Sequence, residues 1–413
     1  MQRSSTVRGI LLSVLAFFLL LPQPTAAQDP GDASDDAEQF FPRHGYLLTG
    51  YGAAGYTTVF AEGDNQPNNF SAILAPVMLF QISDRFLFES EFEFELEEGV
   101  TETQLEYAQV DLSLTNNLTL VAGKFLLPFV NFSERYHPTW INRFITMPAV
   151  YGGHHGQTGP TEALLPVLSD VGAQLRGSFP VGRFGFITAA AFVSQGPRTE
   201  REHEEEEEQH DEEEETPGGA EAAASTTAVS LSEGEDHAAV SAPELVHGTT
   251  FTDNNEDKML GGSVGFGLAP YFEVNVSGMT GAYDPAGDLR FSALGAHVEA
   301  RHKNLMIHGE LIRTIQEVPE DDVPEGDDTV SRAGYWIQTS YRWNRWEPLV
   351  RWSQLFDGEL GDETLFEAGR QLALGLDYWI EPSLFIKAEY TINIEDGPDV
   401  DNNRLALQIA FGF

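Results

Sequence analysis

Short and long connections alternate between the predicted strands of this sequence, from one end of the chain to the other. Alternation of apolar with polar or small residues predicts sixteen strands, which cover residues 45–60, 70–82, 85–97, 103–114, 117–126, 170–179, 183–195, 258–268, 271–283, 288–301, 304–316, 332–343, 346–356, 371–380, 383–394 and 402–413. Every second connection is short, and the short ones fall at residues 83–84, 116, 181–182, 270, 302–303, 344–345 and 381–382. Tight turns at one end and long loops at the other are typical of transmembrane β-barrels, whose strand number is even when both termini lie at the turn end. The pattern predicts an all-β fold, a sixteen-stranded antiparallel transmembrane β-barrel over residues 44–413.

A soluble β-sandwich would show the same alternation within single strands. One predicted strand helps to distinguish the sandwich from the membrane barrel. In the stretch 85–97, phenylalanines occupy one face and glutamates the other, at Phe86, Phe88, Phe92 and Phe94 and at Glu89, Glu91, Glu93, Glu95 and Glu97. A row of carboxylates cannot face a dry core, because burying unpaired charges is too costly. It can face a water-filled lumen while the phenylalanines face lipid. Together with the connection pattern, this strand favours the barrel.

The first residues are typical of a secretory signal peptide. Two arginines precede an apolar run from Ile10 to Leu21, and the small-residue site Thr25-Ala26-Ala27 follows it. The run is shorter than the ~20 residues that a membrane-spanning helix needs. We therefore expect a signal peptide over residues 1–27, a flexible periplasmic lead-in over residues 28–43, and a mature chain without a transmembrane helix.

Composition excludes several classes of function. The chain has 23 lysines and arginines against 65 acidic residues, a formal charge of −42, which argues against binding of nucleic acid. It has no cysteine, so neither disulfides nor thiolate metal sites contribute. The sequence motifs of a nucleophile elbow, a zinc-protease helix or a phosphate-binding glycine loop do not occur. We expect no enzymatic activity and no cofactor.

The parity of each strand gives a set of pore-lining residues, if the phenylalanine and leucine faces point to lipid. The set contains Glu89, Glu91, Glu93, Glu95, Arg176, His297, Arg301, His308, Glu310, Arg342, Arg351, Lys387 and Glu389. Its acids are concentrated on one early strand and its bases on later ones. Opposing walls of unlike charge would set a field across the pore and tune its ion preference. The same residues could instead pair with neighbours on adjacent strands.

The long connection 127–169 is the second candidate feature. It is rich in apolar and aromatic residues, and exposed apolar patches of that size are rare. Folded inward against the barrel wall, it would narrow the pore and place Arg135, His137 and Arg143 at a constriction. Alternatively, these three side chains would anchor the loop by hydrogen bonds to the wall.

Residues 123–129, Gly-Lys-Phe-Leu-Leu-Pro-Phe, precede and begin this loop. Here the sequence resembles the bacterial outer-membrane porins, and most of all the phosphate-selective group, whose corresponding strand carries a similar segment. The resemblance implies a passive diffusion channel in the outer membrane of a Gram-negative cell, often a homotrimer, with an inward constriction loop after the fifth strand. The chain departs from the phosphate-selective pattern because those porins are basic inside, whereas this sequence places glutamates along one wall.

The connection 196–257 is an acidic insert with histidines. Its core, residues 200–215, reads E-R-E-H-E-E-E-E-E-Q-H-D-E-E-E-E and shows no apolar periodicity, as expected of an external, solvated loop. His203 and His210 among so many carboxylates could hold a divalent metal in a loose nitrogen and oxygen site. A charge run that only keeps the surface hydrated is the simpler interpretation.

These observations predict an outer-membrane porin that passes small hydrophilic solutes or ions and has outer-membrane lipid as its surroundings. We expect a weak cation preference from the glutamate row and the acidic insert. Two alternatives stay open: a phosphate- or anion-selective porin, and a barrel that anchors a metal-capturing surface loop.

Overall fold

The computed structural model describes residues 45–60, 69–97, 100–152, 160–199, 243, 245–246, 254–319, 328–361, 363–397 and 402–413. The predicted signal peptide, the lead-in and the acidic core of the insert, with His203 and His210, lie outside these residues. In the described part of the chain, no helix is long and apolar enough to cross a membrane.

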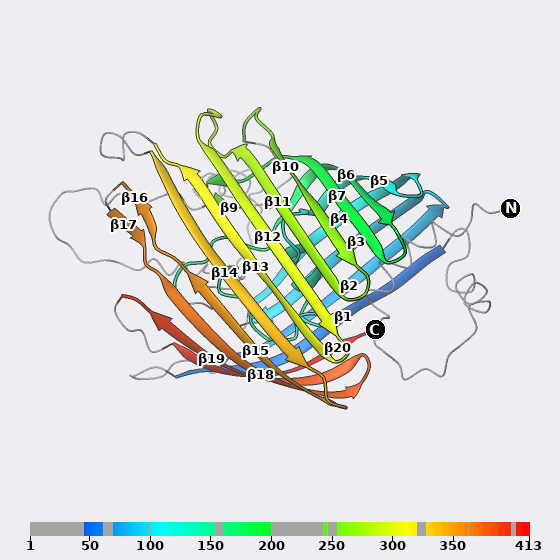
Figure 1. Ribbon diagram of the computed structural model, residues 1–413, viewed down its shortest axis with the longest axis vertical. Helices are drawn as coiled ribbons and strands as arrows, with labels where there is room; N and C mark the ends of the chain where they lie inside the picture. Colours follow the sequence, from blue (N-terminus) through cyan, green and yellow to red (C-terminus); the bar gives the residue numbers. More distant parts are fainter. Residues whose placement is uncertain are drawn as a thin grey trace, which may run out of the picture.

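Sixteen antiparallel strands form a closed barrel among the described residues, as the sequence predicts (Figure 1). They are β1 Gly45–Phe60, β2 Asn69–Ser83, β3 Phe86–Glu97, β4 Val100–Thr115, β5 Leu118–Leu126, β6 Ser169–Val181, β7 Gly185–Ser194, β10 Met259–Leu268, β11 Phe272–Ala282, β12 Arg290–His302, β13 Leu305–Glu317, β14 Thr329–Tyr341, β15 Trp346–Leu355, β18 Gly369–Glu381, β19 Leu384–Glu395 and β20 Asn403–Gly412. The end of the barrel that carries the short connections is called the turn end below, and the opposite end the loop end.

The barrel closes where β20 pairs with β1, from Tyr51 opposite Gly412 to Phe60 opposite Asn403. At the seam, the Gly50 and Phe413 backbones exchange hydrogen bonds of 3.1 and 3.0 Å. Closure removes the unpaired edge that a lipid environment would not tolerate.

Four short strands at the loop end were not predicted. β8 Arg198–Thr199 pairs with β9 Leu245–Val246, and β16 Gly358–Leu360 pairs with β17 Glu363–Phe366. These segments have two to four residues each, too few for a period-2 pattern to appear in the sequence.

The barrel is apolar outside and polar inside, the reverse of a soluble protein. Leu294 on the outer face is 60% exposed, whereas Arg351 on the inner face is fully buried. A β-bulge in β4 interrupts the parity, because Tyr107 lies opposite Glu91 and Leu105 opposite Phe92, which leaves Glu106 as the extra residue.

A residue on the lipid-facing side tests this assignment of faces. Leu294 lies near the middle of β12, so we expect Leu294→Arg to cost about 2–4 kcal/mol of unfolding free energy for the refolded barrel in vesicles, as for arginine at the bilayer midplane. The control is Gln104→Arg, which places the same side chain opposite Glu93 on the inner face and costs less. Equal costs for the two variants, measured by urea unfolding, would contradict the assignment.

Candidate functional site

In the connection between β5 and β6, the described residues 127–152 and 160–168 contact inward-facing side chains of the barrel wall. This connection is called the β5–β6 loop below. A hydrogen bond of 3.0 Å from the Leu127 amide to the Leu168 carbonyl closes its base. From there its described residues contact inward-facing residues of β11 to β15 and β18 to β20. Apolar side chains of the loop also pack in clusters with inner-wall residues of β1, β2, β5, β7 and β10.

Glu310 on β13 fixes the first part of the loop. One carboxylate oxygen accepts hydrogen bonds of 2.8 Å from the backbone amides of Asn131 and Phe132. The other accepts bonds from the Tyr151 hydroxyl at 2.6 Å and the Trp336 indole at 3.1 Å. His297 Nδ1 lies 3.3 Å from the first oxygen. The donors offset the cost of burying a carboxylate whose residue is only 3% exposed.

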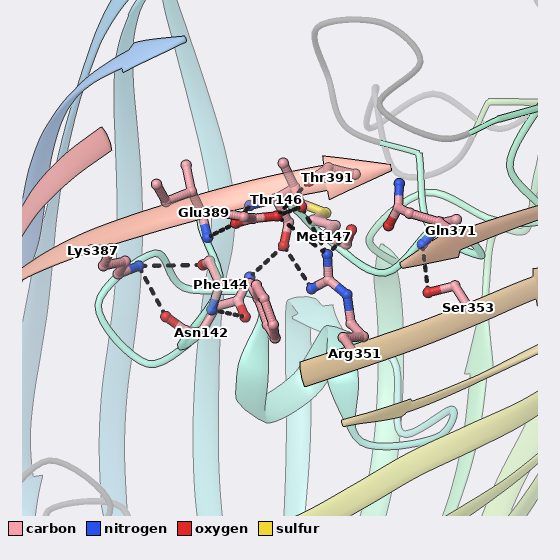
Figure 2. Close-up of polar contacts among 12 residues, drawn as sticks. Asn142, Phe144, Thr146, Met147, Arg351, Ser353, Gln371, Lys387, Glu389 and Thr391 are labelled. Carbon is pink, nitrogen blue, oxygen red and sulfur yellow. Dashed lines mark hydrogen bonds and ion pairs between the residues drawn. The ribbon is translucent and has the colours of Figure 1, made fainter. Parts of the chain in front are cut away.

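Glu389 on β19 repeats the arrangement further along the loop (Figure 2). It accepts hydrogen bonds from the successive amides of Ile145 and Thr146, at 2.6 and 3.0 Å, and from the Thr146 hydroxyl. Arg351 on β15 donates to the Thr146 and Met147 carbonyls at 2.9 and 2.8 Å. Glu389 thus accepts hydrogen bonds from the amides of this loop segment, and Arg351 donates to its carbonyl oxygens.

Lys387, two residues before Glu389, completes this second attachment (Figure 2). Its ammonium group donates to the Thr139, Asn142 and Phe144 carbonyls at 2.5, 2.9 and 3.3 Å. Lys387 is 1% exposed, so its charge is compensated by loop carbonyl oxygens rather than by water.

Charged and phenolic side chains of the loop bind the wall between these two attachments. Arg135 donates to both carboxylate oxygens of Glu273, at 2.9 and 3.1 Å, and Tyr136 donates to Glu299. Burial lowers the pKa of Arg135, but the carboxylates of Glu134 and Glu273 outweigh it and the net shift is upward. Burial, together with Glu299, raises the pKa of Tyr136, so the phenol stays a donor at physiological pH.

Arg143, in the middle of the loop, binds wall residues near the turn end of the barrel. Its guanidinium lies 4.8 Å from the Trp379 ring centroid and 3.8 Å from the Glu347 carboxylate. Arg342 lies over the same indole at 4.0 Å, and the indole nitrogen donates to Glu347 at 3.0 Å. His137, the third predicted constriction residue, is buried within the loop, where its Nδ1 lies 2.5 Å from the Ser133 carbonyl.

Glycines on the inner wall receive bulky loop side chains. A Cβ added to Gly295 would lie 2.4 Å from Val130, and one added to Gly412 would lie 2.9 Å from Trp140. A Cβ added to Gly334 would lie 3.0 Å from Val150, and one added to Gly375 would lie 3.0 Å from Phe144. Val130 has a φ of 50°, which is unfavourable for a β-branched residue, and its amide donates to Ser277 Oγ at 3.0 Å. The wall glycines thus leave space for the loop side chains, and Val130 adopts an unfavourable backbone conformation where the loop packs against the wall.

A row of carboxylates lies on β3 and β4, away from the strands whose side chains bind the loop. Glu91 and Glu93 accept hydrogen bonds from the Tyr51 hydroxyl at 2.7 and 3.1 Å. Glu89 and Asp111 accept bonds from the Gln109 amide at 2.7 and 2.8 Å. Towards the turn end, Arg176 on β6 pairs with Asp111 at 2.5 Å.

Access to this row decreases towards mid-height. Glu93 and Glu95, nearer the loop end, are half-buried, whereas Glu91 and Glu106 are only 3% and 2% exposed. Val77, directly opposite Glu91 on β2, is buried on the inner wall as well. The interior is therefore tightly filled around the middle of the acidic row.

The predicted pore-lining residues thus occupy three kinds of position. With the loop in place, His297, His308, Glu310, Arg351, Lys387 and Glu389 lie beneath it and hold it to the wall. The row Glu89 to Glu95 lies opposite, Arg176 and Arg301 each pair with a neighbouring carboxylate, and Arg342 covers Trp379. The described residues contain no group of three or more acidic or histidine side chains placed to hold a metal ion.

Sequence reasoning missed Tyr51, Gln109, Ser277, Ser353 and Trp379. Tyr51 and Gln109 bind the acidic row, Trp379 binds Arg143, and the two serines accept loop amides. Each shares the inward parity of its strand, so a parity list that included polar and aromatic residues as well as charged ones would have contained all five.

Comparisons with known proteins define the class of fold. No protein-family model matches the sequence, and no curated protein sequence matches it. Among solved structures, OmpF from Salmonella typhi in complex with daunomycin is 10% identical and has a TM-score of 0.53, with 90% of this chain and 98% of that chain covered. An anion-selective porin from Comamonas acidovorans is 12% identical, with a TM-score of 0.52 and coverage of 90% and 100%. The trimer form of OmpT, an outer membrane protein of Vibrio cholerae, is 11% identical, with a TM-score of 0.51 and coverage of 90% and 99%. At these identities the likeness shows the fold alone, which is that of the outer-membrane porins.

Removal of the Glu389 carboxylate tests how the loop is held. Each buried amide left without an acceptor costs about 1–3 kcal/mol. We therefore expect Glu389→Ala to release the loop around Thr146. If the free energy of local opening falls by about 1.4 kcal/mol, the open population rises about tenfold, and tryptic cleavage after Arg143 should accelerate by the same factor. Glu93→Ala is the control, because it removes a carboxylate from the acidic row. Equal resistance of the Glu389 variant and the wild type would show that the loop is held by other contacts.

The glycine and side-chain contacts make a second prediction about the loop. We expect Gly295→Ala to destabilise the folded barrel by about 1–3 kcal/mol, since the added methyl group overlaps Val130 and overpacking has costs of that size. The matched variant Gly55→Ala changes a β1 glycine whose Cβ would first meet Ser71 Oγ at 3.2 Å, so it should cost less. If urea unfolding gives the same cost for both, the wall is not specifically fitted to the loop.

Proposed function

We propose that the protein is an outer-membrane porin that passes small ions and small hydrophilic solutes by diffusion, with a preference for cations. The observation that carries the proposal is the asymmetry of the interior. The row Glu89, Glu91 and Glu93 lies on β3, whereas the β5–β6 loop is bound by side chains of other strands, such as Glu310 on β13 and Glu389 on β19. We propose that this loop is the constriction and that the path runs between it and the acidic row.

The charges beneath the loop are already compensated. Lys387 and Arg351 bind loop carbonyl oxygens, and Glu310 and Glu389 bind loop amides. They therefore contribute little to the field along the path. The acidic row has fewer positive partners, since Arg176 pairs with Asp111 near the turn end. The remaining field favours cations.

Tight filling at mid-height supports a narrow path. Glu91 and Glu106 at this level are only 3% and 2% exposed, so little open volume adjoins them. We infer that ions and the smallest solutes pass, and that larger solutes are excluded.

The matched porin folds include one whose printed description is anion-selective, so the fold does not decide the sign of selectivity. An anion channel would follow if Arg135 and Arg143 controlled the narrowest point. Their side chains are 31% and 27% exposed, but Glu273 and Glu347 respectively lie beside them. We also propose a homotrimer, because one matched structure is described as a trimer form.

The reversal potential in a planar bilayer under a KCl gradient tests the proposal. We expect a cation-selective potential for the refolded protein. Combined Glu89→Gln, Glu91→Gln and Glu93→Gln should shift it towards the anion side, since the row supplies the field. Glu381→Gln, at the exposed end of β18, is the control and should leave the potential unchanged.

Other outcomes of the same experiment distinguish the alternatives. Anion selectivity that phosphate blocks would replace the cation channel with a phosphate-type porin. A complete absence of conductance would exclude both channels and favour a barrel that anchors the insert 196–257, with divalent metal binding by His203 and His210 as its test.

A further inference from the structure

The short connections at the turn end are basic, although the chain as a whole is strongly acidic. They comprise residues 84–85, 116–117, 182–184, 269–271, 303–304, 342–345 and 382–383. These residues include five arginines or lysines and one acid, against 23 and 65 in the whole chain. The turns therefore carry a net charge of +4 (five minus one) in a chain whose net charge is −42.

Four of these basic side chains are exposed at the turn end. Arg85, Arg183, Lys303 and Arg345 are exposed, and the ion pairs of the described residues do not involve them. The fifth, Arg342, packs on Trp379 inside the barrel. The four exposed groups lie on four different turns and so are distributed around the rim.

Exposed aromatic side chains accompany them. Tyr271 and Trp343 are 61% and 65% exposed, and Phe184 lies 5.1 Å beneath the Arg183 guanidinium. Rings of this kind mark the level of lipid headgroups on membrane barrels. Their position fixes the depth of the basic groups at the membrane surface rather than in bulk water.

The described connections at the loop end have the opposite character. Their acids include Glu256, Asp257, Asp284, Asp288, Asp328, Asp357, Glu367 and Asp396. Anionic headgroups would be repelled by these residues, whereas the turns at the other end complement the headgroups in charge.

We propose that the rim of Arg85, Arg183, Lys303 and Arg345 binds the phosphate groups of anionic glycerophospholipids in the leaflet at the turn end. This inference rests on the membrane placement in the proposed function and does not depend on conduction. Arginine and lysine bind phosphate oxygens by charge-assisted hydrogen bonds, and each basic group near an anionic membrane surface contributes roughly 1 kcal/mol. The acyl chains of the same lipid would cover the apolar outer face beside the rim.

Quenching of tryptophan fluorescence by brominated lipid tests the proposal without a functional assay. Trp343 and Trp346, 65% and 44% exposed, report on lipid at the rim. The refolded full chain is placed in phosphatidylcholine vesicles that contain brominated phosphatidylglycerol or brominated phosphatidylcholine. The ratio of the two quenching constants gives the preference for the anionic lipid.

We expect a preference of about fivefold or more for phosphatidylglycerol, the ratio that roughly 1 kcal/mol gives, and its loss in the variant with Arg85→Gln, Arg183→Gln, Lys303→Gln and Arg345→Gln. The control replaces Arg290, Arg313 and Arg370, three outward arginines nearer the loop end, with glutamine and should retain the preference. Inorganic phosphate should not compete.

Three results would overturn the proposal. The wild type could show no preference, the rim variant could keep it, or the control variant could lose it equally, which would assign the effect to overall charge. Folding of each variant is checked by its shift in gel migration on heating.

Discussion

Two buried glutamates determine the interior of this barrel. Glu310 and Glu389 each accept hydrogen bonds from two consecutive backbone amides of the β5–β6 loop, and each would be costly to bury without them. The loop in turn needs the wall, because a segment of this length, with one short π-helix at Phe132–Tyr136 among its described residues, has many backbone groups to satisfy. The buried carboxylates and the loop backbone amides therefore stabilise each other, and this fixes the position of the loop. The apolar cluster that Phe129, Phe132 and Val150 form with wall residues such as Met279 and Trp336 depends on that attachment.

This arrangement also determines which charges remain free to act on a solute. Most of the inward bases and acids between β11 and β19 bind the loop, so the two sides of the interior are electrically unequal. The field that remains comes mainly from β3 and β4. We therefore propose that ion selectivity depends on loop attachment, since moving the loop would expose Lys387 and Arg351 and widen the proposed path.

Much of the fold follows from sequence, and less of the site does. The sixteen strands are predictable because lipid outside and water inside impose period 2 on every strand, as in β3 with its phenylalanine and glutamate faces. The bulge at Glu106 is not, because one extra residue leaves no mark in composition. The loop attachments join residues far apart in the chain, such as Asn131 and Glu310, separated by 179 positions. Gly295 and Gly412 appear in the sequence only as small residues, and their role is visible once Val130 and Trp140 lie against them.

The central claim is that the path runs between the β5–β6 loop and the acidic row. The chain has no cysteine, so single introduced thiols can be modified selectively. The most direct measurement is the change in conductance when a charged methanethiosulfonate reagent is added to Glu93→Cys or to Ser353→Cys, which lies beneath the loop beside the Ala149 amide. We predict rapid block of the Glu93 variant and no effect on the Ser353 variant. Block at Ser353 without block at Glu93 would show that the path runs behind the loop and would contradict the account.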